Sequence, residues 1–579
     1  MAGLEDLTRQ ASRLPGSLSA QEACTKLTEY VPTSFSVSEL LDLTRKLRPD
    51  ENPRPTLLAI AACLEHREHL DRLRYEPEGT TAASDLAEWI ASSIAPVNKH
   101  QPDPNDIEGS TEPDPYPQIS TYLLPLTEPG LLALHHLFHH FDVKSQPLAL
   151  SPSTVITLIS LTDDTQPYST PLSTDLASGL LFCHLMGRDR PSFLVDTVLT
   201  SYLKPLFSSS RPPTVTPSGR KAAFPDKDSL SREPGLPDDS RRTKPWKYVD
   251  LRSIPVLTWA IDASPGGDEE SDMPHWPLYI PPLLALLDDP LTRVRASGLR
   301  LAAAFLRRFP APRLRATGLA RVFEDAVFPT LSYLPSITPE GESVALLDPG
   351  YDALLVLAGR LADRPEPGGE EGGKREERRL LDRMVREGIL TGYFHCPEHP
   401  GIVEVLMRKT GKVVEALGIG AVKHLKDLVP MLKGVVTDPF ASARPAAMRE
   451  GVKALQKVIE HCWPRLVEGV WSEEVLGIVV LGWVGLLDVD EKGNKGKTDV
   501  EVEEDIEEIR QELSKTAAML AAVVRTGGTD LVEKIRPLVD MEPALAGLFK
   551  YEPVVPQPGH GVLVEKREPL VDEEPPGLE

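Results

Sequence analysis

The fold predicted for this chain follows from one stretch of its sequence, WPLYIPPLLALLDDPLTRVRASGLRLAAAFLRRFP, residues 276–310. Leu283 and Leu287 lie on one face of a first helix, and a turn follows at residues 288–290. A second helix carries apolar or small residues at the helical interval, namely Val294, Gly298, Leu301 and Phe305. Gly298 leaves room for the partner helix to approach. Such a helix pair keeps apolar surface on both sides, so we expect it to stack on further pairs.

The same pattern returns in HLKDLVPMLKGVVTDPFASARPAAMREGVKALQKVIEHCWPRL, residues 424–466. With a shift of 149 positions, Pro281 corresponds to Pro430, Asp289 to Asp438 and Arg295 to Arg444. An aspartate in the turn bonds to the free N–H groups at the start of the next helix, and the arginine reaches the neighbouring repeat's turn. A helix, an Asp-containing turn, an arginine and a second helix form the HEAT-repeat pattern. The sequence therefore predicts an all-α protein, a HEAT/armadillo-type α-solenoid of stacked antiparallel helix pairs.

Composition divides the chain into six predicted regions. Apolar helical patterns alternate with stretches rich in Pro, Asp, Ser or Glu, which bury too little surface to offset the entropy of ordering. The predicted regions are an N-terminal helical region (1–95), a Pro-rich loop (96–119), a helical region (120–207), a disordered linker (208–245), the α-solenoid (246–550) and a disordered acidic tail (551–579).

Charge and cysteine content exclude several classes of function. The formal net charge of −23 disfavours binding to nucleic acid and to anionic membranes, which carry the same sign of charge. The five cysteines are far apart and odd in number, which indicates a reducing compartment. No signal-peptide pattern opens the chain, and the apolar run 475–487 reads as a buried core helix.

Three short motifs resemble chemical sites but depart from them. Residues 496–498 (GKT) lack the preceding glycine and strand of a phosphate-binding loop. Residues 488–499 place a lysine where a calcium loop needs an oxygen ligand. The histidine groups HHLFHH (135–140) and FHCPEH (394–399) lack the further ligands of a zinc site. We therefore predict no catalytic residue, no metal site and no cofactor.

Four aromatic residues near the start of the best-patterned region are candidates for partner binding: Trp246, Tyr248, Trp259 and Trp276. Large aromatic side chains supply much of the energy of protein interfaces. The alternative is that most of them close off the first repeat of the solenoid as core residues.

Five blocks of sequence, in order, resemble the Tti-two family (Tel-two-interacting protein two). They are PWKY (245–248), PVLTWAI (255–261), WPLYIPPLLALLDD (276–289), TGLARVFEDAVFPTLSYLPSITPE (317–340) and GYDALLVLA (350–358). The rest of the chain agrees in helical character, and its long Pro-rich inserts resemble those of filamentous-fungal members.

The resemblance implies a non-enzymatic α-solenoid, the smallest subunit of the TTT co-chaperone complex. Its partners would be the other two TTT subunits, themselves HEAT-repeat proteins. Through them it would act with the ninety-kilodalton heat-shock chaperone and the R-two-TP assembly on phosphatidylinositol-kinase-related kinases of the TOR, ATM and ATR types. Cytoplasmic and nuclear localisation is expected with that role. Another HEAT-type adaptor, such as a transport receptor or a phosphatase scaffold, is the alternative.

Overall fold

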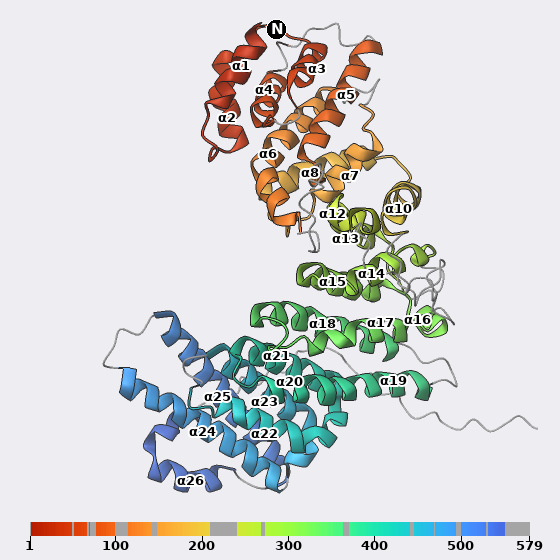
Figure 1. Ribbon diagram of the computed structural model, residues 1–579. Coiled ribbons are helices and arrows are strands. Elements are labelled where there is room, and N and C mark those ends of the chain that lie inside the picture. The colour runs from red at the N-terminus through yellow and green to blue at the C-terminus, as the bar shows by residue number, and fades with distance from the viewer. Residues whose placement is uncertain are drawn as a thin grey trace, which may run out of the picture. The chain divides into compact units, whose positions relative to one another are not determined.

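The chain folds into α-helices joined by turns and loops, as the computed structural model shows (Figure 1). The structure describes residues 2–48, 51–66, 69, 77–98, 114–141, 148–208, 240–267, 273–362, 370–440, 445–467, 469–493, 500–528 and 531–549. Within these ranges it contains no strand, although Val97 and Asp250 form an isolated antiparallel bridge. The predicted all-α class, a HEAT/armadillo-type solenoid of paired helices, is confirmed.

Two compact units divide the chain, Met1–Val405 and Leu406–Glu579. The sequence pattern placed a boundary at residue 246 instead. The structure has none there, because α12 (Pro245–Tyr248) packs on α10 (Lys204–Phe207), and α13 (Ser253–Ala263) packs on the helices before it. The predicted linker is also shorter at its end, since α11 (Ser240–Thr243) is helical. Residues 209–239 and the predicted tail lie outside the described ranges.

The first unit begins with helices that range from short ones to one of 26 residues. They are α1 (Ala2–Ser12), α2 (Ala20–Leu27), α3 (Val37–Lys46), α4 (Arg54–Glu65), α5 (Pro77–Ile94), α6 (Tyr116–Phe141), α7 (Pro152–Ser160), α8 (Pro171–Leu185) and the continuous helix α9 (Arg190–Ser192), η3 (Phe193–Leu203) and α10. Capping side chains determine where several of these helices begin. Ser19 with Glu22, and Ser36 with Glu39, form reciprocal capping boxes that satisfy the free N–H groups of α2 and α3.

The repeat predicted around residue 283 forms as expected. Its elements are η6 (Trp276–Leu278), α14 (Ile280–Leu287) and α15 (Thr292–Arg308). A Cβ atom at Gly298 would lie 2.8 Å from the Leu286 Cβ and 3.0 Å from the Leu287 backbone nitrogen, so glycine permits this approach. Phe305 is fully buried and stacks on Phe309 at 5.1 Å between ring centroids. The predicted face of this helix pair is therefore core.

The turn of this repeat also bonds as the pattern predicts. The Asp289 carboxylate accepts the Leu291 N–H at 3.0 Å, just before α15, and Asp438 accepts the Phe440 N–H at 2.9 Å in the second copy. Arg295 donates from Nε to the Asp289 carbonyl at 3.0 Å, and its guanidinium lies 4.5 Å from the ring centroid of Tyr333, next to the following turn. Arg444, its counterpart, lies outside the described residues.

The first unit continues with helices stacked one on the next: α18 lies against α15, and α19 lies against α18 (Figure 1). They are α16 (Ala311–Thr317), α17 (Leu319–Val327), η7 (Phe328–Ser332), α18 (Glu340–Ala362), α19 (Glu370–Arg383), η8 (Met384–Leu390) and α20 (Thr391–His395). The chain then passes through α21 (Pro400–Leu417) into the second unit.

The second unit packs its helices around α23, which lies against α25. Its elements are η9 (Gly418–His424), α22 (Leu425–Val436), α23 (Pro445–Leu466), α24 (Val470–Gly493), α25 (Val500–Thr526), α26 (Leu531–Met541) and η11 (Pro543–Gly547). Residues Val470–Leu487 of α24 are long and apolar enough to cross a membrane, and 44% of these residues are buried inside the unit. Val475, Ile478 and Val479 are core, as expected for this run, whereas Leu481 is exposed.

Candidate protein-binding surfaces

Three of the four aromatic candidates for partner binding lie in the core. Trp246, Tyr248 and Trp276 are 1%, 3% and 7% exposed. Trp246 stacks on Phe207 at 5.1 Å, and Trp276 meets Phe309 edge-on. Side chains with so little exposed area have no surface to offer a partner in this conformation. The structure therefore assigns these three to the packing of the first repeat, the alternative stated above.

A buried ion cluster holds the α12 segment in place. The Asp289 carboxylate is fully buried and accepts from Lys247 Nζ at 2.8 Å and Lys244 Nζ at 2.9 Å. Burial opposes ionisation of Asp289, but the two ammonium groups and the Leu291 N–H outweigh it and hold the carboxyl pKa below its ordinary value. The sequence indicated only a turn residue at Asp289, because its lysine partners are 42 and 45 positions away.

Trp259, the fourth candidate, lines an apolar cleft of about 870 Å³. α8, η3, α13 and the segment before α14 form its walls. The Trp259 ring meets Phe193 edge-on at 6.3 Å between centroids. The other large apolar side chains that line the cleft are Leu181, Phe182, Leu185, Leu194, Val195, Leu199, Met273 and Tyr279.

The cleft opens beside exposed apolar side chains of α8 and the turn after it. Phe182 is 56% exposed and Met186 is 61% exposed, and the Arg190 guanidinium lies 5.9 Å from the Phe182 ring centroid. Aromatic residues, methionine and arginine are enriched at protein interfaces. An apolar cleft with such a rim suits a partner's apolar side chains better than a small polar substrate.

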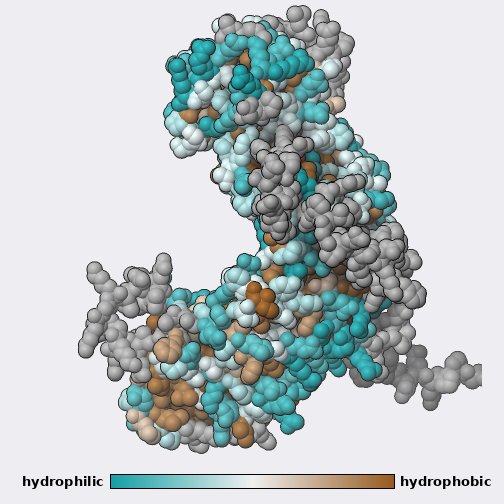
Figure 2. Space-filling model, in the orientation of Figure 1, coloured by the Kyte–Doolittle hydropathy of each residue, from teal (hydrophilic) through white to brown (hydrophobic). Residues whose placement is uncertain are grey.

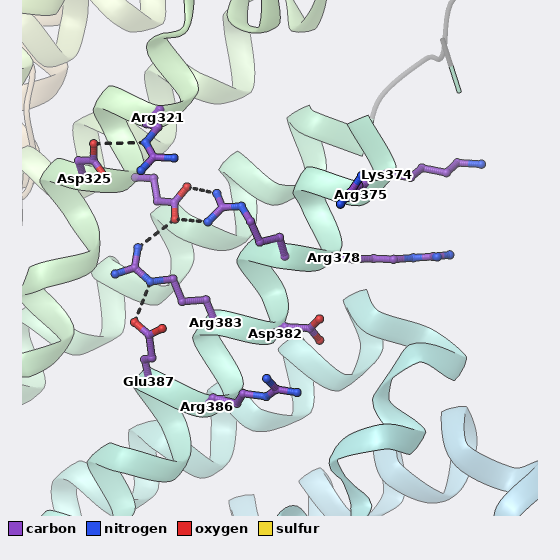
Figure 3. A pocket seen from close by; sticks show the side chains of 11 residues that line it. Arg321, Asp325, Lys374, Arg375, Arg378, Asp382, Arg383, Arg386 and Glu387 are labelled. Atoms are coloured by element: carbon purple, nitrogen blue, oxygen red, sulfur yellow. Dashed lines mark hydrogen bonds and ion pairs between the residues drawn. The ribbon is translucent and has the colours of Figure 1, made fainter. Parts of the chain in front are cut away.

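A second hollow, of about 1000 Å³, lies where α17 faces α19 and η8 (Figure 3). We call it the basic groove. Its lining carries seven basic and four acidic side chains: Arg321, Lys374, Arg375, Arg378, Arg379, Arg383, Arg386, Glu324, Asp325, Asp382 and Glu387. The excess of three positive charges contrasts with the net charge of −23 of the whole chain.

Ion pairs join the two walls of the basic groove. The buried Glu324 of α17 accepts from Arg379 and, at 3.0 Å, from Arg383. Burial opposes ionisation of Glu324, but these two guanidinium groups hold its pKa below the ordinary value. Arg383 also pairs with Glu387, and Arg321 pairs with Asp325 (Figure 3). Glu324 and its arginines are 55 and 59 positions apart, so the sequence pattern did not reveal the groove.

A third surface is an apolar patch on the second unit. Figure 2 shows hydrophobic residues gathered near α24 and α26. The exposed large apolar residues of these two helices are Val470, Leu481, Leu538 and Met541. Single exposed apolar residues are common, whereas a group of them marks a contact surface.

The motifs that resemble chemical sites do not come together as sites in the part of the chain that the structure describes. No group of three or more His, Cys, Asp or Glu residues lies close enough there to hold a metal ion. His399 instead pairs with Glu340, at 3.2 Å from Nδ1 to the carboxylate. Residues 496–498, and the side chains of the calcium-like loop 488–499, lie outside the description.

These features define a class: a helical-repeat protein whose described surface includes an apolar cleft and a basic groove. The model of the Tti2 family matches residues 154–443, half of the chain, including both hollows. The chain belongs to the Tti2 family, as the five sequence blocks indicated.

Comparison with curated protein sequences finds no match. Among solved structures, the crystal structure of importin beta in a polyethylene glycol condition has a TM-score of 0.31 and 9% identity, over 94% of this chain and 79% of that one. The structure of the Pds5–Scc1 complex has a TM-score of 0.23 and 11% identity, over 94% of each chain.

Proposed function

We propose that this protein is a non-catalytic scaffold subunit of the TTT complex, acting as a co-chaperone for phosphatidylinositol-kinase-related kinases of the TOR, ATM and ATR types. The observation that carries the proposal is the match to the Tti2 family over residues 154–443. The partners it implies are the other two TTT subunits, and indirectly the kinases, the ninety-kilodalton heat-shock chaperone and the R-two-TP assembly. With this role we expect the protein in the cytoplasm and the nucleus.

The apolar cleft around Trp259 is the surface we assign to a TTT partner. It lies within the matched region, and its lining includes the exposed Phe182. The exposed Met186 follows the lining residue Leu185 in the sequence. Burying such side chains against a partner supplies binding energy, because apolar surface leaves water. A HEAT-type adaptor of another kind, a transport receptor or a phosphatase scaffold, would use a cleft of the same chemistry, so the identity of the partner separates the two.

Capture of purified partners tests the proposal. The full-length chain, immobilised, should retain the other two TTT subunits. If it retains neither, and instead binds transport cargo or a phosphatase catalytic subunit, the proposed function is wrong.

Substitutions then test the cleft. Trp259→Ala and Phe182→Ala should weaken capture while lowering the melting temperature less than Trp246→Ala does, because Trp246 is buried. Phe394→Ala, at a residue 78% exposed on α20, is the control and should leave capture intact. If both cleft variants capture as wild type does, the partner binds elsewhere and only the cleft assignment fails.

A further inference from the structure

We propose that the basic groove binds an acidic segment of a partner protein in an extended conformation. The segment would lie along α19 and η8, with its carboxylates on Lys374, Arg378 and Arg386, which we call the outer row. This goes beyond the proposed function, because binding of such a segment by the purified chain does not require the TTT subunits.

The basic side chains of the groove fall into two groups. Arg321, Arg379 and Arg383 make ion pairs with carboxylates of the groove itself. The outer row and Arg375 take part in no ion pair among the described residues. In Figure 3, Lys374, Arg378 and Arg386 extend to the side away from Arg321. These exposed cations are therefore available to an anion from outside.

The inner ion pairs give the outer row a fixed support. Glu324 holds both Arg379 and Arg383, so α19 is tied to α17. Leu380, Leu381 and Met384 of the same segment are fully buried. Binding of a ligand to the outer row then costs mainly the conformational entropy of side chains, because the helix is already ordered. A preorganised site binds more tightly for the same contacts.

Spacing along the helix favours an extended peptide. An α-helix rises about 1.5 Å per residue, so Lys374 and Arg378 of α19 are about 6 Å apart along the axis. Arg386, in the π-helix η8, lies about two turns further along. An extended chain places every second side chain about 6.6 Å apart on one face. Acidic residues at every second position of an extended peptide would therefore lie next to the basic residues of the outer row. Asp382 lies between Arg378 and Arg386, and its charge disfavours a carboxylate at the peptide position that faces it.

The chemistry of the row favours carboxylates over nucleic acid. The guanidinium fork binds a carboxylate through two parallel hydrogen bonds. A nucleic acid brings a long array of phosphates, which the net charge of −23 repels as a whole. A short acidic segment meets chiefly the local excess of positive charge, because salt screens charges beyond about 8 Å at physiological ionic strength.

Fluorescence anisotropy with the full-length chain tests the inference. The probe is a fluorescein-labelled peptide of alternating Glu and Ser, and the control peptide has Gln in place of Glu. Arg378→Glu/Arg386→Glu should weaken binding of the Glu peptide by about tenfold or more, because two attractive contacts become repulsive. The matched control is Arg300→Glu/Arg307→Glu, the same change at two exposed arginines of α15, and should shift the affinity less than twofold.

A variant that binds the peptide more tightly provides a second test, because unfolding would only weaken binding. Asp382→Asn removes the carboxylate that lies on α19 between Arg378 and Arg386, and should tighten binding of the Glu peptide severalfold. Equal weakening by both double variants, equal binding of the Gln peptide, or no effect of Asp382→Asn on a folded chain would each overturn the proposal.

Two other occupants are separated by the same assay. Tighter binding of inositol hexakisphosphate or a DNA oligonucleotide than of the peptide, at matched ionic strength, would make the groove a phosphate site and overturn the proposal. Neutralising the chain's own tail, with Asp572→Asn, Glu573→Gln and Glu574→Gln, should leave peptide affinity unchanged. A tenfold gain there would instead identify the tail as the occupant.

Discussion

Asp289 is a buried carboxylate whose loss should destabilise the first unit. Asp289→Ala leaves the 3% exposed Lys247 charged and without its carboxylate, which costs about 3–5 kcal/mol of unfolding free energy. Replacing the pair together, as Asp289→Ala/Lys247→Met, should cost less than Asp289→Ala alone, since no buried charge then lacks a partner. Urea denaturation followed by circular dichroism measures both.

A surface pair provides the comparison for that prediction. Asp6 and Arg9 form an ion pair in which both side chains are more than half exposed, so Asp6→Ala should cost less than about 1 kcal/mol. A double variant at residues 247 and 289 that is less stable than Asp289→Ala would show that the lysine contributes mainly by packing its apolar stem.

His184 should make the stability of the first unit depend on pH. Burial, with a contribution from Arg188, lowers its pKa from 6.5 to about 4. Above pH 6.5 the imidazole is neutral in both the folded and the unfolded state, and its titration takes nothing from the free energy of unfolding. As the pH falls from 6.5 to about 4, the unfolded chain takes up a proton that the folded chain does not, and stability falls by at most about 3 kcal/mol.

Urea denaturation across that pH range measures the effect. His184→Gln should flatten the decline, because glutamine does not titrate. His275→Gln replaces an exposed histidine and should keep the decline of the wild type. A decline of the same size in His184→Gln would assign it to other groups.

The approach of α14 and α15 depends on the glycine between them. A methyl group at residue 298 would meet both the side chain and the backbone of α14, so Gly298→Ala should destabilise by about 1–3 kcal/mol despite the better helix propensity of alanine. Gly359→Ala, on the exposed face of α18 with no atom within 4 Å of the new Cβ, should instead stabilise by up to about 1 kcal/mol. Thermal unfolding of the two variants should shift in opposite directions, and a shift of the same sign in both would contradict this account.

The first unit should survive a cut between its earlier and later helices. Arg252 donates to Thr157 Oγ1 at 3.0 Å, Trp246 stacks on Phe207, and Val97 pairs with Asp250 across the same junction. After cleavage at a specific protease site inserted within residues 209–239, the two fragments should therefore co-elute in size-exclusion chromatography. The predicted fragment 246–550 should not separate as a stable piece.

Weakening the junction should release the fragments. Trp246→Ala removes a buried ring that contacts the earlier helices, so the cut variant should elute as two species. Phe394→Ala, at an exposed residue of α20, should not change the elution of the cut chain. Separation of the fragments in the wild type would restore residue 246 as a domain boundary.

The sequence by itself determined the helical-repeat class, the α14–α15 pair and the family. The class and the helix pair depend on local signals: apolar residues at the helical interval, an aspartate two positions before the N–H it binds, and a glycine where two helices meet. The family depends instead on the resemblance of the five sequence blocks and on the match of the family model. Residues such as Gly298 and Phe305 could be placed in the core from spacing alone, because helical geometry converts sequence distance into a face.

Only the tertiary structure decided which surfaces are open to partners. Trp246 and Trp259 look alike in sequence, yet one is buried against Phe207 and the other lines a cleft. The basic groove and the Asp289 cluster likewise join residues more than 40 positions apart. Burial and charge pairing depend on which helices pack together, and no local pattern carries that information, because the contacts form only when distant segments of the chain meet.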